Sequence, residues 1–101
     1  MVRESSEPRL SYQSCKVLNT FLAEPSRELA GADLITGAKV PSGTLYPILQ
    51  RFEYAGWLRS RWEKGDASEK GRPLRKLYRI TGSGLARGAE LRDEFLRGLT
   101  L

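Results

Sequence analysis

The chain has 101 residues, of which 17 are lysine or arginine, 12 are aspartate or glutamate and none is histidine, so its net charge is +5. This length suffices for one domain with one modest core. A single cysteine excludes an internal disulfide, and without histidine a transition-metal site would have to consist of carboxylates.

No apolar run approaches the about 20 residues of a membrane span, and residues 1–20 lack the apolar core of a signal peptide. With one cysteine, this favours the reducing cytoplasm. The positive charge suggests an anionic partner, nucleic acid first and a membrane surface second. Charge alone fits equally well a soluble protein that happens to be basic.

The N-terminal quarter predicts a mobile arm followed by one helix. Residues 1–9 are polar and have no hydrophobic period, which is typical of an arm. From Leu10 to Glu24 apolar residues recur at helical spacing, with Ser11 as a cap and Pro25 after the end. Cys15 lies beside the apolar stripe, so we expect a buried small residue rather than a redox centre.

The next segment predicts the start of a helix-turn-helix. Residues 27–29 indicate a short extended link, and residues 31–36 indicate a short helix that Gly37 closes. Its inward-facing residues are expected to be Ala32 and either Leu34 or Ile35. Residues 39–41 form the turn before the next helix, a spacing typical of a helix-turn-helix but shared by many helical bundles.

Residues 41–56 predict the helix around which the chain is organised. Either Ser42 or Thr44 can cap its first turn, and Gly56 suits a left-handed residue at its end. One apolar stripe follows the spacing i, i+3, i+4 and i+7 and consists of Leu45, Ile48, Leu49 and Phe52. The opposite face carries polar groups and rings with almost no acidic charge: Gly43, Tyr46, Pro47, Gln50 and Tyr54, flanked by Ser42 and Arg51. Such a helix can pack on a core with one face and meet a nucleic acid with the other.

After Gly56 the hydrophobic period changes from 3.6 to 2, which predicts two strands at residues 57–63 and 75–80. The polar, glycine-rich residues between them are expected to project as a flexible tip. We expect two shared faces, one of Leu58, Ser60 and Trp62 and one of Lys76, Tyr78 and Ile80, with the register left open. We call residues 64–76 the wing. It carries five cations, partly offset by Asp66 and Glu69: Lys64, Lys70, Arg72, Arg75 and Lys76.

The last element is predicted to be a helix over residues 85–99, opened by Thr81 as its N-cap. Its apolar stripe consists of Leu85, Gly88 or Ala89, Leu91, Phe95, Leu96 and Leu99. Either the first helix or a second copy of the chain must cover this stripe. We expect a homodimer through Leu91, Phe95, Leu96 and Leu99.

Three helices, a two-stranded hairpin with a basic tip and a final helix make a winged helix-turn-helix. The predicted fold class is therefore mostly α with a small β-hairpin and with N- and C-terminal helices. The predicted organisation is an arm at residues 1–9, a DNA-binding domain at 10–81 and a dimerisation helix at 82–101.

The sequence resembles the PadR family of bacterial transcriptional regulators, in its short, single-domain form. The resemblance rests on residues 42–53 (Ser-Gly-Thr-Leu-Tyr-Pro-Ile-Leu-Gln-Arg-Phe-Glu), on 55–58, and on 71–81 with Gly84. It covers roughly residues 10–98. It implies a dimeric DNA-binding repressor that is often released by a small effector, with the final helix mediating dimerisation.

Two family features are not carried over. The longer effector domain of the large PadR subfamily is not matched. Some short members hold flat aromatic ligands between tryptophans at the dimer interface, but residues 82–101 contain no tryptophan. Trp57 and Trp62 are expected to pack in the core or the hairpin instead. A small-molecule effector therefore stays an open partner without assigned residues.

DNA contacts are expected from the helix at about 42–55 and from the wing. Ser42 and Thr44 can cap the helix, meet a phosphate or do both. Tyr46 can reach a phosphate unless its ring is partly buried, and Gln50 can read adenine. Pro47 can pack on a thymine methyl group. Arg51 either contacts the DNA backbone or pairs with Glu53 or Glu63. The candidate DNA-binding residues are Ser42, Thr44, Tyr46, Pro47, Gln50, Arg51, Lys70, Arg72 and Arg75.

The leading hypothesis is a dimeric, sequence-specific repressor with its recognition helix in the major groove and its wing on the backbone or in the minor groove of double-stranded DNA. The alternative is a winged-helix module that binds proteins without specific DNA binding, in which the basic wing is only a solvated loop. An enzyme is not expected, because the sequence has no histidine, no paired carboxylates and no phosphate-binding glycine loop. No catalytic residue, cofactor or metal ligand is assigned.

Overall fold

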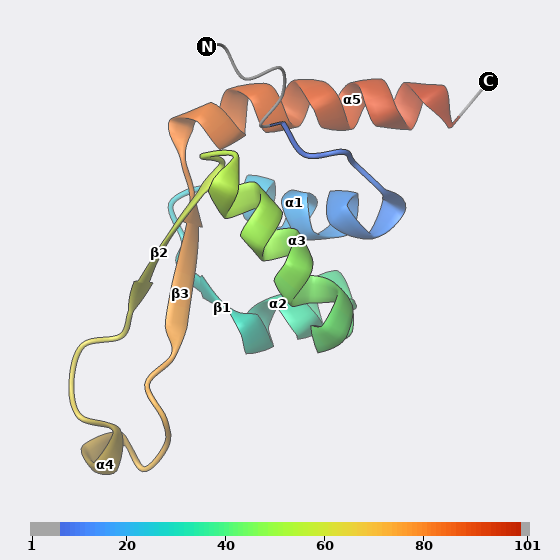
Figure 1. The fold of residues 1–101 in the computed structure, drawn as a ribbon. Helices are drawn as coiled ribbons and strands as arrows, with labels where there is room; N and C mark the ends of the chain where they lie inside the picture. The colour runs from blue at the N-terminus through green and yellow to red at the C-terminus, as the bar shows by residue number, and fades with distance from the viewer. Residues whose placement is uncertain (1–6, 100–101) are drawn as a thin grey trace.

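A computed structural model describes residues 7–99 and shows a helical body with a projecting hairpin (Figure 1). The elements in chain order are α1 (Tyr12–Ala23), β1 (Leu29–Ala30), α2 (Gly31–Ala38), α3 (Ser42–Tyr54), β2 (Leu58–Trp62), α4 (Ala67–Lys70), β3 (Lys76–Ile80), η1 (Gly84–Gly88) and α5 (Ala89–Gly98). Helix α5 lies along one end of the body, and α4 lies at the far tip of the hairpin. The predicted winged helix-turn-helix with N- and C-terminal helices is confirmed.

The predicted mobile arm is only partly inside the described residues. Residues 1–6 lie outside them. Glu7 forms an ion pair with Arg87 of η1, and Pro8 is buried. The salt bridge of Glu7 and the burial of Pro8 show that these two residues do not project freely, whereas the rest of the arm stays a prediction.

Helix α1 begins as its sequence predicts. The Ser11 hydroxyl accepts a hydrogen bond from the Ser14 amide at 3.1 Å, and the Ser14 hydroxyl accepts one from the Ser11 amide at 2.7 Å. This reciprocal pair is a capping box. Cys15 is buried as predicted, and burial raises the pKa of its thiol.

Helix α2 differs from the prediction in two details. Helix α2 continues past Gly37 to Ala38 and ends at Lys39, whose φ of 56° is left-handed and whose carbonyl accepts from Lys16 Nζ at 3.2 Å. Ala32 is exposed rather than inward-facing, since its position turns away from buried Leu34.

The predicted side-chain cap of α3 is wrong. The N-cap residue is Pro41, which has no side-chain donor or acceptor, and no side chain of the described residues caps the first turn. The Pro41 carbonyl accepts from the amides of Thr44 and Leu45 at 3.0 and 2.9 Å. Gly56 has the expected left-handed conformation, with a φ of 80°.

Within residues 7–99 the sheet has three antiparallel strands in the order β1-β3-β2, one more than predicted. Residues expected to form an extended link supply β1, in which Leu29 lies opposite Tyr78. In the hairpin, the partners Leu58–Ile80, Ser60–Tyr78 and Trp62–Lys76 confirm the two predicted shared faces.

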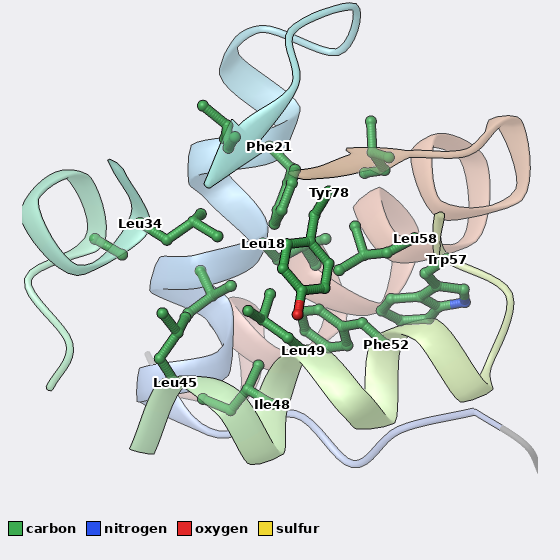
Figure 2. Packing of buried hydrophobic residues seen from close by; sticks show 14 of the residues in the cluster. Leu18, Phe21, Leu34, Leu45, Ile48, Leu49, Phe52, Trp57, Leu58 and Tyr78 are labelled. Carbon is green, nitrogen blue, oxygen red and sulfur yellow. The ribbon is translucent and has the colours of Figure 1, made fainter. Parts of the chain in front are cut away.

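The core fills the space between the helices and one face of the sheet (Figure 2). All four residues of the α3 stripe are buried, as predicted: Leu45, Ile48, Leu49 and Phe52. Trp57 is buried and packs on Phe52 with ring centroids 5.3 Å apart. Trp62 is 61% exposed. The prediction of packing for Trp62 is wrong because β2 has already left the body at that residue.

The last helix is joined to the body through Thr81. Its hydroxyl accepts from the Gly84 amide at 3.0 Å, which confirms the predicted cap, and donates to the Gly56 carbonyl at 2.6 Å. The Thr81 amide donates to the Trp57 carbonyl at 2.9 Å. The first turns are π-helical, which the sequence did not predict.

Helix α5 has no fully buried residue. Leu91 packs partly on the core, whereas Leu96 and Leu99 are 41% and 59% exposed. Helix α1 therefore covers only part of the predicted apolar stripe. Within residues 7–99, no helix is long and apolar enough to cross a bilayer.

Candidate nucleic-acid interface

The outward face of α3 presents the side chains predicted to contact DNA. Five of these residues are exposed, namely Ser42, Tyr46, Pro47, Gln50 and Arg51, whereas Thr44 is half-buried. No described residue forms an ion pair with Arg51, so the alternative of pairing with Glu53 or Glu63 is wrong. The hydroxyl groups of Ser42 and Thr44 are not used for capping.

Tyr46 lies partly against α2 and partly in solvent, with 45% of its surface exposed. A Cβ atom on Gly31 would lie 2.1 Å from the Tyr46 hydroxyl oxygen, so only glycine leaves room for this ring position. Among described residues, none forms a hydrogen bond with that hydroxyl group. The expected partial burial of Tyr46 is therefore confirmed, with the hydroxyl end of the ring lying against Gly31, and its phosphate contact stays a prediction.

A groove joins α3 to the wing. Its volume is about 510 Å³, and its lining comes from β1, α2, α3 and both strands of the hairpin: Ala30, Gly31, Ala32, Tyr46, Trp62, Leu74, Arg75, Lys76 and Tyr78. Lys76 Nζ lies 5.7 Å from the Tyr78 ring centroid and 4.0 Å from a Glu53 carboxylate oxygen. The structure thus brings Tyr46 and Arg75, two predicted contact residues, to one groove.

The tip of the wing is more structured than a plain flexible loop. Asp66 Oδ1 accepts from the Ser68 amide at 2.9 Å and caps the one-turn helix α4, which Gly71 ends with a φ of 70°. The sequence holds this signal as an aspartate cap followed, five residues later, by a glycine. Lys70, a predicted contact, lies in α4 and lines a separate hollow with Arg61 and Lys64.

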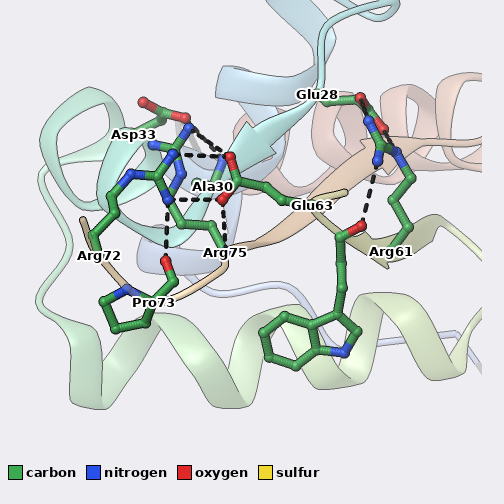
Figure 3. A network of polar contacts seen from close by, with 9 residues as sticks. Glu28, Ala30, Asp33, Arg61, Glu63, Arg72, Pro73 and Arg75 are labelled. Carbon is green, nitrogen blue, oxygen red and sulfur yellow. Dashed lines mark hydrogen bonds and ion pairs between the residues drawn. The ribbon is translucent and has the colours of Figure 1, made fainter. Parts of the chain in front are cut away.

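The wing is organised around Glu63, a residue that the sequence analysis missed as a site residue (Figure 3). Its Oε1 accepts from Arg72 Nη1 at 2.7 Å and from the Arg75 amide at 2.8 Å. Its Oε2 accepts from Arg72 Nη2 at 3.0 Å and from Arg75 Nη2 at 3.4 Å. Two of the predicted DNA-contact arginines therefore share one carboxylate.

These donors hold the pKa of Glu63 well below its usual range, through the Arg72 hydrogen bond first and the Arg75 amide second. The Arg72 pKa is raised by the same pair. Only 11% of the Glu63 side chain is exposed. The carboxylate is thus charged whenever the wing is folded at ordinary pH.

We expect the wing to stay ordered until the pH falls below the range in which glutamates usually protonate. A lowered folded-state pKa stabilises the folded form fully above the unfolded value, near 4.3, and this stabilisation is lost as pH falls through the folded value. The measurement is an NMR titration of the Glu63 carboxyl carbon. In Arg72→Ala its midpoint should move upward, and an unchanged midpoint would contradict the assigned cause.

The outer face of the hairpin carries further arginines. Arg61 forms two hydrogen bonds of 2.7 Å with Glu28. Arg59 and Arg79 lie directly opposite each other on β2 and β3 and form no ion pair within the described part of the chain. Like charges in this position repel, so these two arginines do not stabilise the pairing of β2 with β3.

A model of the family described as "Transcriptional regulator PadR-like family" matches residues 30–90. Among solved structures, the chain is similar to a PadR-like transcription factor from Bacteroides fragilis, with 25% identity and a TM-score of 0.65 over 83% of this chain and 80% of that one. It is similar to smu.1704 from Streptococcus mutans UA159, with 30% identity and a TM-score of 0.62 over 87% and 81% of the two chains.

A PadR family transcriptional regulator from Eggerthella lenta DSM 2243 has 26% identity and a TM-score of 0.62, over 87% of this chain and 80% of that one. Among curated proteins, none matches the chain. The family match spans α2, α3 and the whole hairpin, which are the elements that form the groove.

Proposed function

Because the chain belongs to the PadR-like family of transcriptional regulators, we propose that it is a dimeric repressor that binds a specific DNA sequence through α3 and the wing. The observation that carries the proposal is the outward face of α3. That face exposes polar and aromatic groups with no carboxylate among them, and it borders a groove that continues into a basic wing.

Helix α3 has the shape and chemistry of a recognition helix. An α-helix fits the major groove, where Gln50 can bond adenine through two hydrogen bonds and Pro47 can contact a thymine methyl group. The uncapped first turn leaves amides and the Ser42 and Thr44 hydroxyl groups to meet a phosphate. Glu53, the acidic residue nearest this face, is occupied by Ser60 at 2.5 Å and by Lys76.

The wing supplies the backbone or minor-groove contact. Arg72 and Arg75 are each about two-fifths exposed, and Lys70 is exposed at the tip. Arginine suits phosphate recognition because its planar guanidinium group can donate two parallel hydrogen bonds. We propose that these cations help to set the register of the protein on DNA, while α3 reads the bases of the major groove.

Helix α5 supplies the dimer contact in this proposal. Leu96 and Leu99 are exposed and Phe95 and Leu91 half-buried, so one face of the helix is apolar and only partly covered by the described residues. We accordingly assign residues 10–81 to DNA binding and residues 82–101 to dimerisation. A two-fold dimer would read two half-sites about one helical turn apart.

The proposal is tested by selecting bound fragments from random duplex DNA and then measuring the affinity for the selected sequence against salt. We expect a palindrome and a log–log slope of about −0.9 per phosphate neutralised. No selection, or an affinity independent of salt, would contradict the proposal. If the protein then binds a protein partner, and this binding is unchanged when both Tyr46 and Arg72 are replaced by alanine, the result would support a protein-interaction module.

Two substitutions distinguish base recognition by α3 from sequence-independent DNA contact by the wing. Gln50→Ala should relax the preference at one base pair and leave the salt slope unchanged. Lys70→Ala should weaken binding to all sequences alike and reduce the slope by about 1. Equal effects of the two variants on selectivity would contradict the roles assigned to α3 and the wing. The measurement is the dissociation constant for matched and mismatched duplexes over a salt series.

A further inference from the structure

A carboxylate in the middle of a DNA-binding wing has a cost, because it repels the phosphates that the wing must approach. Glu63 nevertheless lies there, nearly buried, among the wing cations. We propose that Glu63 is a specificity-determining residue. It fixes Arg72 in one geometry, and its negative charge lowers the affinity of the protein for non-specific DNA. This inference rests on the DNA-binding function proposed above.

Glu63 closes the hairpin as well as binding the arginines. Its amide donates to the Arg75 carbonyl at 2.8 Å, and its carboxylate accepts from the Arg75 amide at the same distance. Backbone and side chain therefore both join the two ends of the tip. The carboxylate cannot move without opening this last pair of the ladder, so it is a fixed support for Arg72.

Glu63 engages only one of the two edges of the Arg72 guanidinium group that can donate a pair of hydrogen bonds. The two terminal nitrogens of Arg72 bind the two oxygens of Glu63, and Nη1 also donates to the Pro73 carbonyl at 3.1 Å. A guanidinium group has five donors, and among described residues nothing binds Nε. Nε and the remaining hydrogen of Nη2 form a second fork on a side chain that is 40% exposed. Arg72 can thus present two parallel donors to DNA while Glu63 holds it.

This arrangement makes Arg72 a directional contact. A free arginine at a loop tip can follow any phosphate by changing rotamer, so it attracts DNA without regard to sequence. A held guanidinium group meets a pair of acceptors only where the base edges or the local groove shape place them. Glu63 also removes one positive charge, which lowers the attraction to every sequence equally. Specificity should therefore rise while non-specific binding falls.

The test compares Glu63→Gln with Glu69→Gln. Glu69 is an exposed residue of α4 that forms no hydrogen bond or ion pair within the described residues. Both substitutions remove one negative charge from the wing, and only the first removes the charged support of Arg72. The measured quantity is the ratio of dissociation constants for a scrambled duplex and for the selected duplex, over a salt series.

Both variants should bind the scrambled duplex more tightly than the parent, by a similar factor. Glu69→Gln should keep the parent ratio, whereas Glu63→Gln should lower it by roughly tenfold, the contribution of one bidentate contact. Equal ratios in the two variants would overturn the inference and leave Glu63 as a mere charge. A parent protein that does not distinguish the duplexes would instead contradict the proposed function.

Arg72→Lys keeps the test decisive if Glu63→Gln perturbs folding. It preserves the net charge of the wing but replaces the fork with a single ammonium group. We expect the same roughly tenfold loss of selectivity with little change in affinity for the scrambled duplex. Selectivity equal to that of the parent would show that the held geometry of Arg72 plays no part in recognition.

Discussion

Gly84→Ala should destabilise the fold by about 2 kcal/mol, the middle of the range for inserting a methyl group into a packed site. The added Cβ would lie 2.4 Å from the Trp57 carbonyl oxygen and 2.8 Å from Ile80 Cγ1. The oxygen belongs to the backbone and already accepts from the Thr81 amide, so it cannot move away without weakening that hydrogen bond. The helix-propensity gain of alanine, about 1 kcal/mol, offsets only part of the clash.

Gly82→Ala is the matched control, because a Cβ at Gly82 meets nothing within 4 Å. Thermal unfolding should show a loss of roughly 10 °C for Gly84→Ala and little change for Gly82→Ala. Both proteins should be compared at one concentration, since the proposed dimerisation would make the midpoint depend on it. Similar midpoints would show that the junction between the sheet and the last helix yields without cost.

Phe95→Asp combined with Leu99→Asp should convert the protein to a monomer and weaken operator binding by roughly 100-fold, the usual order for losing the second of two linked contacts. The physical reason is the cost of facing two carboxylates with an apolar partner surface. Phe95 is half-buried and Leu99 is 59% exposed, so removing them should leave the core intact.

Light scattering measures the mass, and binding to whole and half operators measures the linkage. Ser26→Asp with Thr36→Asp adds the same two charges at exposed positions of the turn after α1 and of α2, and it should stay dimeric. A monomeric parent would contradict the dimer proposal directly. A dimeric double variant would place the contact elsewhere on the surface.

Periodic features were predictable from the sequence because repetition along a helix or strand reports which face is buried. The stripe of α3 and the two shared faces of the hairpin strands follow from spacing alone, whereas the pairing of Ser60 with Tyr78 was left open by the sequence. Strand β1 did not, because two residues carry no period and their pairing depends on β3, almost fifty residues later. Trp62 was misplaced since alternation does not show where a strand leaves the body.

The site was predictable where it depends on exposure and not where it depends on the path of a loop. The outward residues of α3 are exposed as expected, and their DNA contacts stay predictions. Glu63 was missed because its partners, nine and twelve residues away, are reached only through the fold of α4. The cap of α3 was wrong because Pro41 precedes Ser42 and fixes the entry to the helix.

The hydrogen bonds between Glu63 and Arg75 also allow the tip of the hairpin to be replaced as a unit. Residues 64–74 contain no buried side chain, and the strands on either side are joined before the tip begins. Tips of other lengths and sequences could therefore be grafted between these two residues without repacking the core. If the chain binds DNA as proposed, recombination at this point would alter the choice of DNA sequence while leaving the core as it is.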